Sequence, residues 1–359
     1  MNYRHTKILA STSLTNNTTY TLDLNLVDPI SRISVVYKAL NGDSVPDGHM
    51  ASGVTKIELV DGSDVLFSMS GKETQATDFY DTGKEPVNGM TYTTGNYPWA
   101  IFNMNFGRFL FDDVLALDPK RFKNLQLKVT HNYSLCGSSC SASTLEVWGD
   151  VFQDKKVSPR GFLMNKELYT YTMGASGSYE YIDLPTDYPY RRLTVFGMYA
   201  NYQPWQIANE IRIDENNLKQ VIVDDLVSNL LKTAAGLYGV YTEGLIVTAT
   251  TSVQSFYCTP TYFVSASAMN MGDTDTILNL DSPSYGGELK LEGEGAGLFS
   301  VIVRGWAPNG AIPIPFGDEQ NIADFYNITT VGSVQLRIKA GTLGGTASIQ
   351  VVLQQMRTY

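Results

Sequence analysis

Two pairs of adjacent carboxylates are the residues best suited to chemistry in this chain of 359 residues. Asp112-Asp113 and Asp224-Asp225 are the residue type that a glycosidase uses as its acid and its base or nucleophile. Asp224-Asp225, however, opens a predicted helix, where the helix dipole stabilises negative charge in any case. We therefore favour a structural role for both pairs, and the sequence predicts no catalytic residues.

The three histidines and one further acidic motif offer little more. His5, His49 and His131 show no nucleophile or metal-binding spacing, and we expect them at the surface. Asp273 and Asp275 are weak calcium candidates because they place carboxylates two residues apart, but the glycine and glutamate of a calcium-hand loop are missing. A surface turn is the favoured interpretation, so the sequence predicts no cofactor and no other metal.

Three cysteines bear on redox state and metal binding. Cys136 and Cys140 lie in a loop rich in glycine and serine, and Cys258 stands alone. Three is an odd number for a disulfide framework, and His131 is the only further ligand near the loop for zinc. Free thiols are the favoured state, with a local disulfide and a metal site as the alternatives.

Aromatic and basic residues could serve recognition. Basic pairs at 155–156 and 191–192 are typical of solvated faces or interface contacts. The tryptophans are expected in the core or at a subunit interface rather than in a sugar-binding platform; they are Trp99, Trp148, Trp205 and Trp306.

Composition limits the class of protein. The chain is 43% hydrophobic, so it can bury a full core, and its length suggests about two domains. A net charge of −10 argues against coating of nucleic acid over the whole surface. No apolar run reaches the roughly 18 residues of a spanning helix, and Ile8-Leu9-Ala10 is too short for a signal peptide. We expect a soluble chain made in the cytoplasm.

The elements that must position these residues are predicted to be short strands joined by turns. Residues 54–60 alternate apolar with polar before an Asp-Gly turn and a return strand at 65–67. One short helix is expected at 71–80. A second is expected to begin with Asp224 as N-cap and to run to Lys232, with Gly236 beyond its end.

The second half of the chain repeats the first. Residues 21–35 align with 181–195 without a gap and share Asp-Leu, Pro, Arg and Val at the same places. Weaker matches follow in the same order: 56–62 with 210–216, Phe106-Gly107 with Phe316-Gly317, 122–129 with 332–339, and 144–147 with 348–351. A repeat this long indicates a duplicated domain, because solenoid periods are about 20–50 residues.

The repeat divides the chain into four parts. We predict an arm at 1–19, a first domain at 20–154, a linker at 155–178 and a second domain at 179–359 with an insertion at about 233–294.

Two tandem all-β units in an acidic chain of this length resemble the double jelly-roll major capsid proteins of tailless icosahedral viruses, a group that includes membrane-containing bacteriophages and adenovirus-type viruses. The resemblance implies two eight-stranded jelly rolls with short helices and long apical loops. It also implies a homotrimer with a pseudo-hexagonal outline that tiles an icosahedral shell in the virion, with no enzymatic activity.

The resemblance has further implications for loops and partners. The 81–97 loop, the cysteine loop and the insertion would project outward. The arm and the tail at 354–359 would reach neighbouring capsomers, an internal membrane or the genome, and penton or minor capsid proteins would be further partners. The main alternative is a carbohydrate-active enzyme or lectin built on two jelly rolls. A viral spike or fibre is less favoured because no shaft repeat is found.

Overall fold

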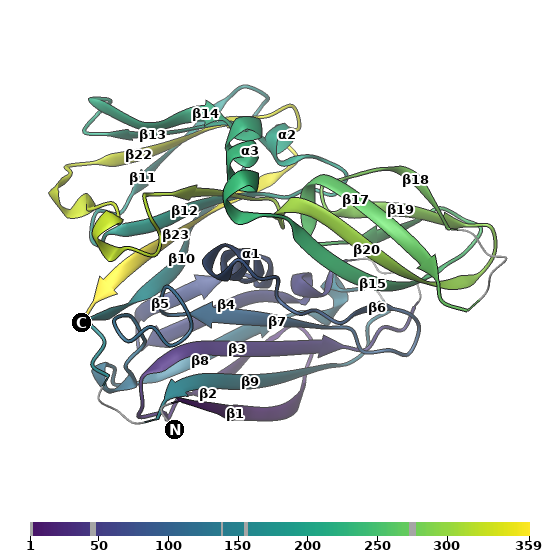
Figure 1. Cartoon of the computed structure of the whole chain (residues 1–359), viewed down its shortest axis with the longest axis horizontal. Coiled ribbons are helices and arrows are strands. Elements are labelled where there is room, and N and C mark those ends of the chain that lie inside the picture. The colour runs from purple at the N-terminus through teal and green to yellow at the C-terminus, as the bar shows by residue number, and fades with distance from the viewer. Residues whose placement is uncertain (1–2, 44–47, 138, 154–156, 273–277) are drawn as a thin grey trace.

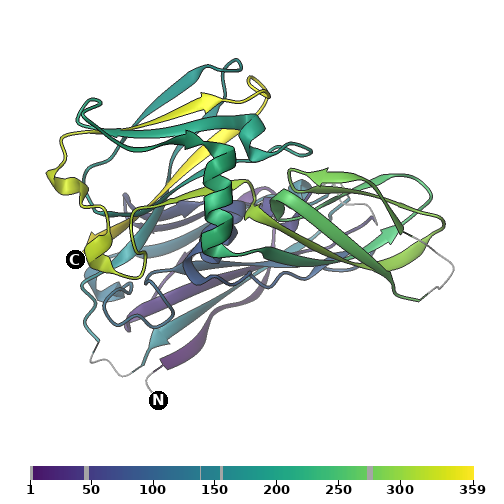
Figure 2. The same ribbon diagram turned by 45° about the horizontal axis from the view of Figure 1, so that its top comes forward.

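A computed structural model describes residues 3–43, 48–137, 139–153, 157–272 and 278–359. Two β-sandwiches lie against each other, and a third group of strands extends from them to one side (Figure 1). Both chain ends lie on the opposite side of the molecule, as Figures 1 and 2 show. The all-β class expected from the sequence is therefore correct.

The first sandwich, the first roll, is built from one sheet of order β1-β9-β3-β7 and a facing set of order β2-β8-β4-β5. Its inward residues alternate with outward ones, as in β7 and β8, because successive strand side chains point to opposite faces. Its strands are β1 (Tyr3–Leu14), β2 (Thr18–Asp23), β3 (Ile30–Ala39), β4 (Val54–Asp61), β5 (Asp64–Met69), β7 (Trp99–Asn105), β8 (Leu125–His131) and β9 (Ser143–Phe152).

The second roll repeats this arrangement with the orders β10-β23-β12-β21 and β11-β22-β13-β14. Every pair of segments aligned in the sequence repeat falls on equivalent strands or just beyond them. Within the described residues each roll has eight strands, the number that a jelly roll requires. The strands of the second roll are β10 (Gly161–Thr172), β11 (Tyr179–Leu184), β12 (Tyr190–Gly197), β13 (Ala208–Glu215), β14 (Gln220–Leu226), β21 (Ala311–Pro315), β22 (Val334–Ala340) and β23 (Ser348–Thr358).

One sheet runs through both rolls. Strand β5 of the first roll pairs in parallel with β10 of the second, with Phe67 opposite Asn165 and Ser68 opposite Lys166. The resulting order is β2-β8-β4-β5-β10-β23-β12-β21. The two rolls therefore share backbone hydrogen bonds as well as side-chain contacts.

The insertion lies between α3 and β21 and forms two small sheets. One has the order β17-β20-β15-β6 and includes β6 (Met90–Tyr92), which the first roll contributes from the 81–97 loop. The other has the order β16-β19-β18. The strands are β15 (Tyr241–Ala249), β16 (Gln254–Tyr257), β17 (Pro260–Asn270), β18 (Leu278–Tyr285), β19 (Glu288–Gly293) and β20 (Gly297–Pro308).

Two longer helices hold equivalent places in the two rolls. Helix α1 (Gly71–Thr82) follows β5, and helix α3 (Val227–Tyr238) follows β14. A short helix α2 (Pro204–Ile207) precedes β13. Single 3-10 turns are η1 (Met50–Gly53), η2 (Pro119–Arg121), η3 (Tyr133–Leu135), η4 (Ile322–Asp324) and η5 (Ile328–Thr330). In the described part of the chain, no helix has the length and apolar character needed to cross a bilayer.

The structure corrects the predicted arm, linker and tail. Residues 3–14 form β1, which pairs with β9, because an exposed edge strand can be polar on both faces. Residues 161–172 of the predicted linker form β10. The tail belongs to β23, where Arg357 pairs with Asp64 at 2.6 Å. Residues 3–14 and 348–358 are therefore held in strands.

The second predicted helix begins later than expected. Strand β14 continues to Leu226 and holds Asp224 opposite Arg212 of β13, so Asp224 is not the N-cap. Leu226 takes that position without a side-chain cap. The helix then passes through Gly236 and ends at Gly239, whose φ of 77° suits glycine.

Candidate functional site

The predicted chemical residues do not come together. Asp112 is fully buried and accepts hydrogen bonds from Arg108 Nε at 2.7 Å and from the Val114 amide at 2.9 Å. Asp113 is exposed. Burial raises the pKa of Asp112, but the hydrogen bonds from Arg108 and the backbone outweigh it and hold the pKa below its usual value. Asp224 pairs with Arg212 at 3.0 Å on the outer face of the second roll. Asp112 and Asp224 therefore each have a structural partner.

The expected surface position of the histidines is correct only for His5, which bonds Asp150 at 2.8 Å. His131 is buried beneath Tyr37, and burial lowers its pKa. His49 is buried where the first roll meets the insertion. Strong strand alternation places His131 on an inward position, a signal that was present in the sequence.

His49 and Glu243 form the anchor of the insertion. The Ala51 amide donates to His49 Nδ1 at 3.0 Å, so the ring proton is on Nε2 and is donated to Glu243 Oε1, also at 3.0 Å. The Thr259 amide donates to the second carboxylate oxygen at 2.7 Å. Burial raises the pKa of Glu243, but the contacts with His49 and Thr259 hold it below its usual value. A buried carboxylate thus joins three separate segments.

The three cysteines are buried thiols, as favoured from the sequence. Burial raises the pKa of both Cys136 and Cys258, which makes these thiols poor nucleophiles. Among the described residues, no cluster of three or more His, Cys, Asp or Glu could hold a metal. Asp273 and Asp275 lie outside the described residues.

The junction between the rolls contains a group of buried charges. Asp81, at the end of α1, accepts a hydrogen bond from Arg191 Nη1 at 2.6 Å and another from Arg192. Both arginines belong to β12. Gln354 of β23 donates to the same carboxylate at 3.1 Å. Arg192 also pairs with Glu319 at 2.9 Å. Arg191 and Arg192 are both buried, so the expected solvated face is wrong for this pair. The contact that they make lies between the two rolls of one chain.

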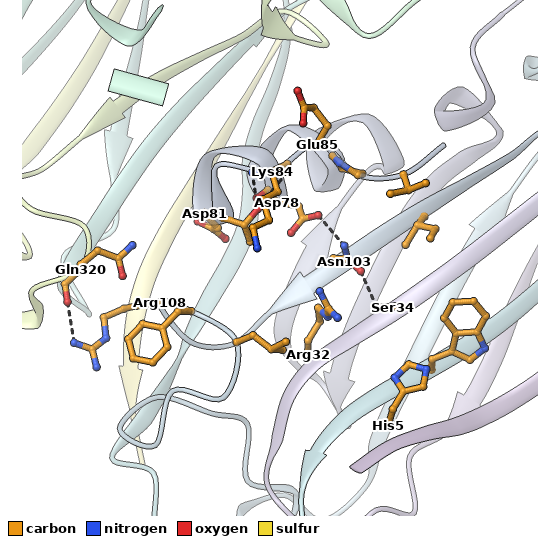
Figure 3. Close-up of a pocket in the computed structure, with 17 residues that line it drawn as sticks. His5, Arg32, Ser34, Asp78, Asp81, Lys84, Glu85, Asn103, Arg108 and Gln320 are labelled. Atoms are coloured by element: carbon orange, nitrogen blue, oxygen red, sulfur yellow. Dashed lines mark hydrogen bonds between the residues drawn. The ribbon is translucent and has the colours of Figure 1, made fainter. Parts of the chain in front are cut away.

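A pocket of about 650 Å³ opens on the first roll (Figure 3). His5 and Arg32 from the sheet stand on one side, and Asp78, Lys84 and Glu85 from α1 and the segment after it stand on the other. Side chains of Val87, Phe109 and Leu110 add exposed apolar surface to its lining.

This pocket does not have the character of a glycosidase site. Its carboxylates are engaged. Asp81 is held by the arginines, and Asp78 accepts hydrogen bonds from Asn103 Nδ2 at 2.8 Å and Asn105 Nδ2 at 2.7 Å. Glu85 accepts one from the Thr242 amide at 3.1 Å. Burial raises the pKa of Asp78 to about 6. Trp148 is the one tryptophan that lines the pocket among the described residues, whereas Trp205 and Trp306 both pack against Tyr262 of the insertion. Carboxylates and tryptophans therefore do not converge on a groove between the rolls.

Comparison of the fold with solved structures gives full-length matches. The major capsid protein of Sulfolobus turreted icosahedral virus is similar with a TM-score of 0.63 and 10% identity, over 100% of this chain and 97% of that one. The major capsid protein of bacteriophage PM2 is similar with a TM-score of 0.56 and 9% identity, over 99% of this chain and 98% of that one. The chain of the PBCV-1 virus capsid is similar with a TM-score of 0.58 and 11% identity, over 99% of this chain and 94% of that one. No protein-family model and no curated protein matches the sequence.

These matches span both rolls, the junction and the insertion. The chain therefore has the double jelly-roll fold, as its resemblance to that group of proteins implies.

Proposed function

We propose that this chain is a major capsid protein, which forms homotrimers of pseudo-hexagonal outline that tile an icosahedral shell. The observation that carries the proposal is the match to capsid proteins over more than nine tenths of both chains, including the junction that fixes the two rolls side by side. Its site is then a set of subunit interfaces and not a catalytic centre.

The surface of the chain supports this proposal. Large apolar side chains are exposed on all three parts of the molecule, including Phe109 on the first roll, Leu237 on the second and Phe263 on the insertion. On the first roll, Phe109 lines one pocket together with the exposed side chains of Val87 and Leu110, and a contiguous apolar patch of this kind is typical of an interface. Three chains with two rolls each supply six similar blocks, the number that a hexagonal tile needs.

The placement of the insertion fits the same proposal. The insertion and β6 lie at one end of the molecule, away from both termini (Figure 1). In a shell this end would face outward and the termini inward. Neighbouring capsomers would be the main partners, with penton or minor capsid proteins at the edges of the tiling and the virion as the location.

Size-exclusion chromatography with light scattering, followed by negative-stain microscopy, tests the proposal. A trimer of about three times the 39.6 kDa chain mass with a hexagonal outline is expected. A chain that stays monomeric at all concentrations and cleaves or binds glycans would contradict it and favour the carbohydrate-active alternative.

A further inference from the structure

The internal repeat allows one interface to be deduced from another. Helices α1 and α3 are equivalent, so that Gly71 corresponds to Val227, Tyr80 to Gly236 and Asp81 to Leu237. Nearly all of α1 is buried, whereas the last turns of α3 are largely exposed and Leu237 is 63% accessible. The same element is covered in one roll and open in the other.

The outer face of the second roll covers α1. Asp81 reaches Arg192 in β12 and Gln354 in β23. Tyr80 donates its hydroxyl to the Ala311 carbonyl at 3.1 Å and packs on Tyr238 with ring centroids 4.7 Å apart. The end of α1 therefore fills the space between α3 and the sheet of the second roll.

The equivalent space in the first roll is the 650 Å³ pocket. By the alignment of the repeats, Arg32 corresponds to Arg192 and Ser34 to Thr194, and both Arg32 and Ser34 line the pocket. Figure 3 shows this space between the sheet and α1. The exposed side chains of Val87, Phe109 and Leu110 provide apolar contacts for an apolar helix end.

The strand edges repeat the same pattern. Strand β5 pairs in parallel with β10, whose equivalents are β14 and β1. In the described part of the chain, β14 pairs only with β13 and β1 only with β9. By equivalence, Asp224 corresponds to Ser68 and Thr6 to Lys166. Two unpaired strand edges thus lie beside the two open surfaces, one on each roll.

We propose that two copies of this chain join head to tail by repeating the internal junction. The last turn of α3 in one copy, with Leu237, enters the pocket of the next copy. Beside this contact, β14 of the first copy runs parallel to β1 of the next copy. This inference rests on the proposed function and names the contact that would build its oligomer. A heterologous contact of this kind closes into a ring when successive rolls are related by one sixth of a turn.

A cysteine pair tests the strand register. Thr6→Cys with Asp224→Cys, oxidised as the assembled full chain, is expected to give covalent dimers and trimers on non-reducing gels, because the corresponding residues Ser68 and Lys166 are paired within the chain. Co-expressed single variants should give dimers only, and each single variant alone none. Thr6→Cys with Val221→Cys is the out-of-register control. Ser68→Cys with Lys166→Cys is the matched control for an internal link.

A second variant tests the helix contact. Leu237→Glu is expected to weaken association by about 10-fold or more, as the loss of one buried leucine implies. Val27→Glu, at a loop residue of similar exposure (62%), should leave association unchanged. Circular dichroism melting of both variants shows whether the fold is intact.

The outcomes separate the two proposals. An oligomer that forms without the Thr6–Asp224 link, or is indifferent to Leu237→Glu, would overturn this contact and leave the capsid proposal standing. A wild-type chain that never associates would overturn both.

Discussion

At the scale of single residues, the most consequential group is Asp81. Its carboxylate is 2% exposed and is the shared partner of two buried arginines. Removing one member of a buried ion pair leaves an uncompensated charge, which costs far more than a surface pair contributes. The sequence marked 191–192 as a basic pair, but nothing local to α1 indicated that an aspartate some 110 residues earlier would contact it.

Asp81→Asn is expected to destabilise the chain by about 3–5 kcal/mol, because two buried guanidinium groups lose their shared counter-charge. Urea unfolding followed by tryptophan fluorescence measures this. Asp64→Asn is the control: its partner is Arg357, but Asp64 is 43% exposed, so a loss of at most about 1 kcal/mol is expected. Equal losses for both variants would contradict the assignment of the buried cluster.

Glu73 gives stability a dependence on pH. Burial, with a smaller effect of Glu167, raises the pKa of Glu73 from 4.5 to about 7. The folded chain therefore holds this proton at pH values where the unfolded chain has lost it. The contribution is fully favourable below pH 4.5 and is lost as the pH rises to about 7, a change of about 3 kcal/mol.

Glu73→Gln is accordingly expected to stabilise the chain more at pH 8 than at pH 5, since glutamine keeps an acceptor for the Ser70 amide without the charge. Urea midpoints of wild type and variant at the two pH values test this. A difference between the proteins that is the same at both pH values would show that Glu73 is not responsible.

At the scale of elements, the two equivalent helices differ at their starts. Ser70 caps α1 through a reciprocal capping box with Glu73, whereas Leu226 precedes α3 without any side-chain cap. The first helix was predicted closely from Lys72, Glu73 and Gln75, and the capping pair of Ser70 and Glu73 is a further local signal for its start. It misplaced the start of the second because Asp224 resembles a cap but belongs to a strand that ends two residues later.

Substitutions at the two N-cap positions should therefore change the stability of the chain in opposite directions. Ser70→Ala is expected to cost about 1 kcal/mol, and Leu226→Ser to gain up to about 1 kcal/mol because it supplies a missing acceptor for the first turn. Chemical denaturation of the two variants beside wild type measures both effects. A loss of stability in Leu226→Ser would indicate that its side chain is needed by the fold.

Strand β1 shows why an exposed edge is hard to predict. Tyr3–Leu14 is mostly exposed or half-buried, and its polar composition led to the prediction of an arm. Its equivalent β10 begins with five buried residues, because β5 and the second roll cover it. The difference in burial between β1 and β10 depends on neighbouring strands that are distant in sequence. It therefore cannot be predicted from the local sequence of either strand.

At the scale of the whole molecule, the two rolls share one sheet, and one buried cluster crosses the junction between them, while the interior of the second roll forms a cluster of its own. The largest buried cluster includes Val35 and Leu127 of the first roll, Phe162 and Val352 of the second, and Val301 of the insertion. Units that share backbone pairing and core contacts are expected to unfold together. The sequence repeat, by contrast, had suggested two domains joined by a linker.

Calorimetry of the isolated chain is therefore expected to show a single main transition. In Asp81→Asn the junction is weaker, and the transition is expected to broaden or to split. Two well-separated transitions in wild type would show that the rolls are energetically independent despite the continuous sheet.

The sequence by itself determined the all-β class, the duplication and the short helix at 71–80, because alternation, turn residues and caps are local, and because a repeat is visible wherever both copies keep their inward residues. The tertiary structure alone decided that residues 3–14 are a strand, that His49 and Glu243 meet, and that Asp81 is shared by two arginines. These depend on which distant surfaces come together, and backbone pairing and burial are properties of neighbours in space.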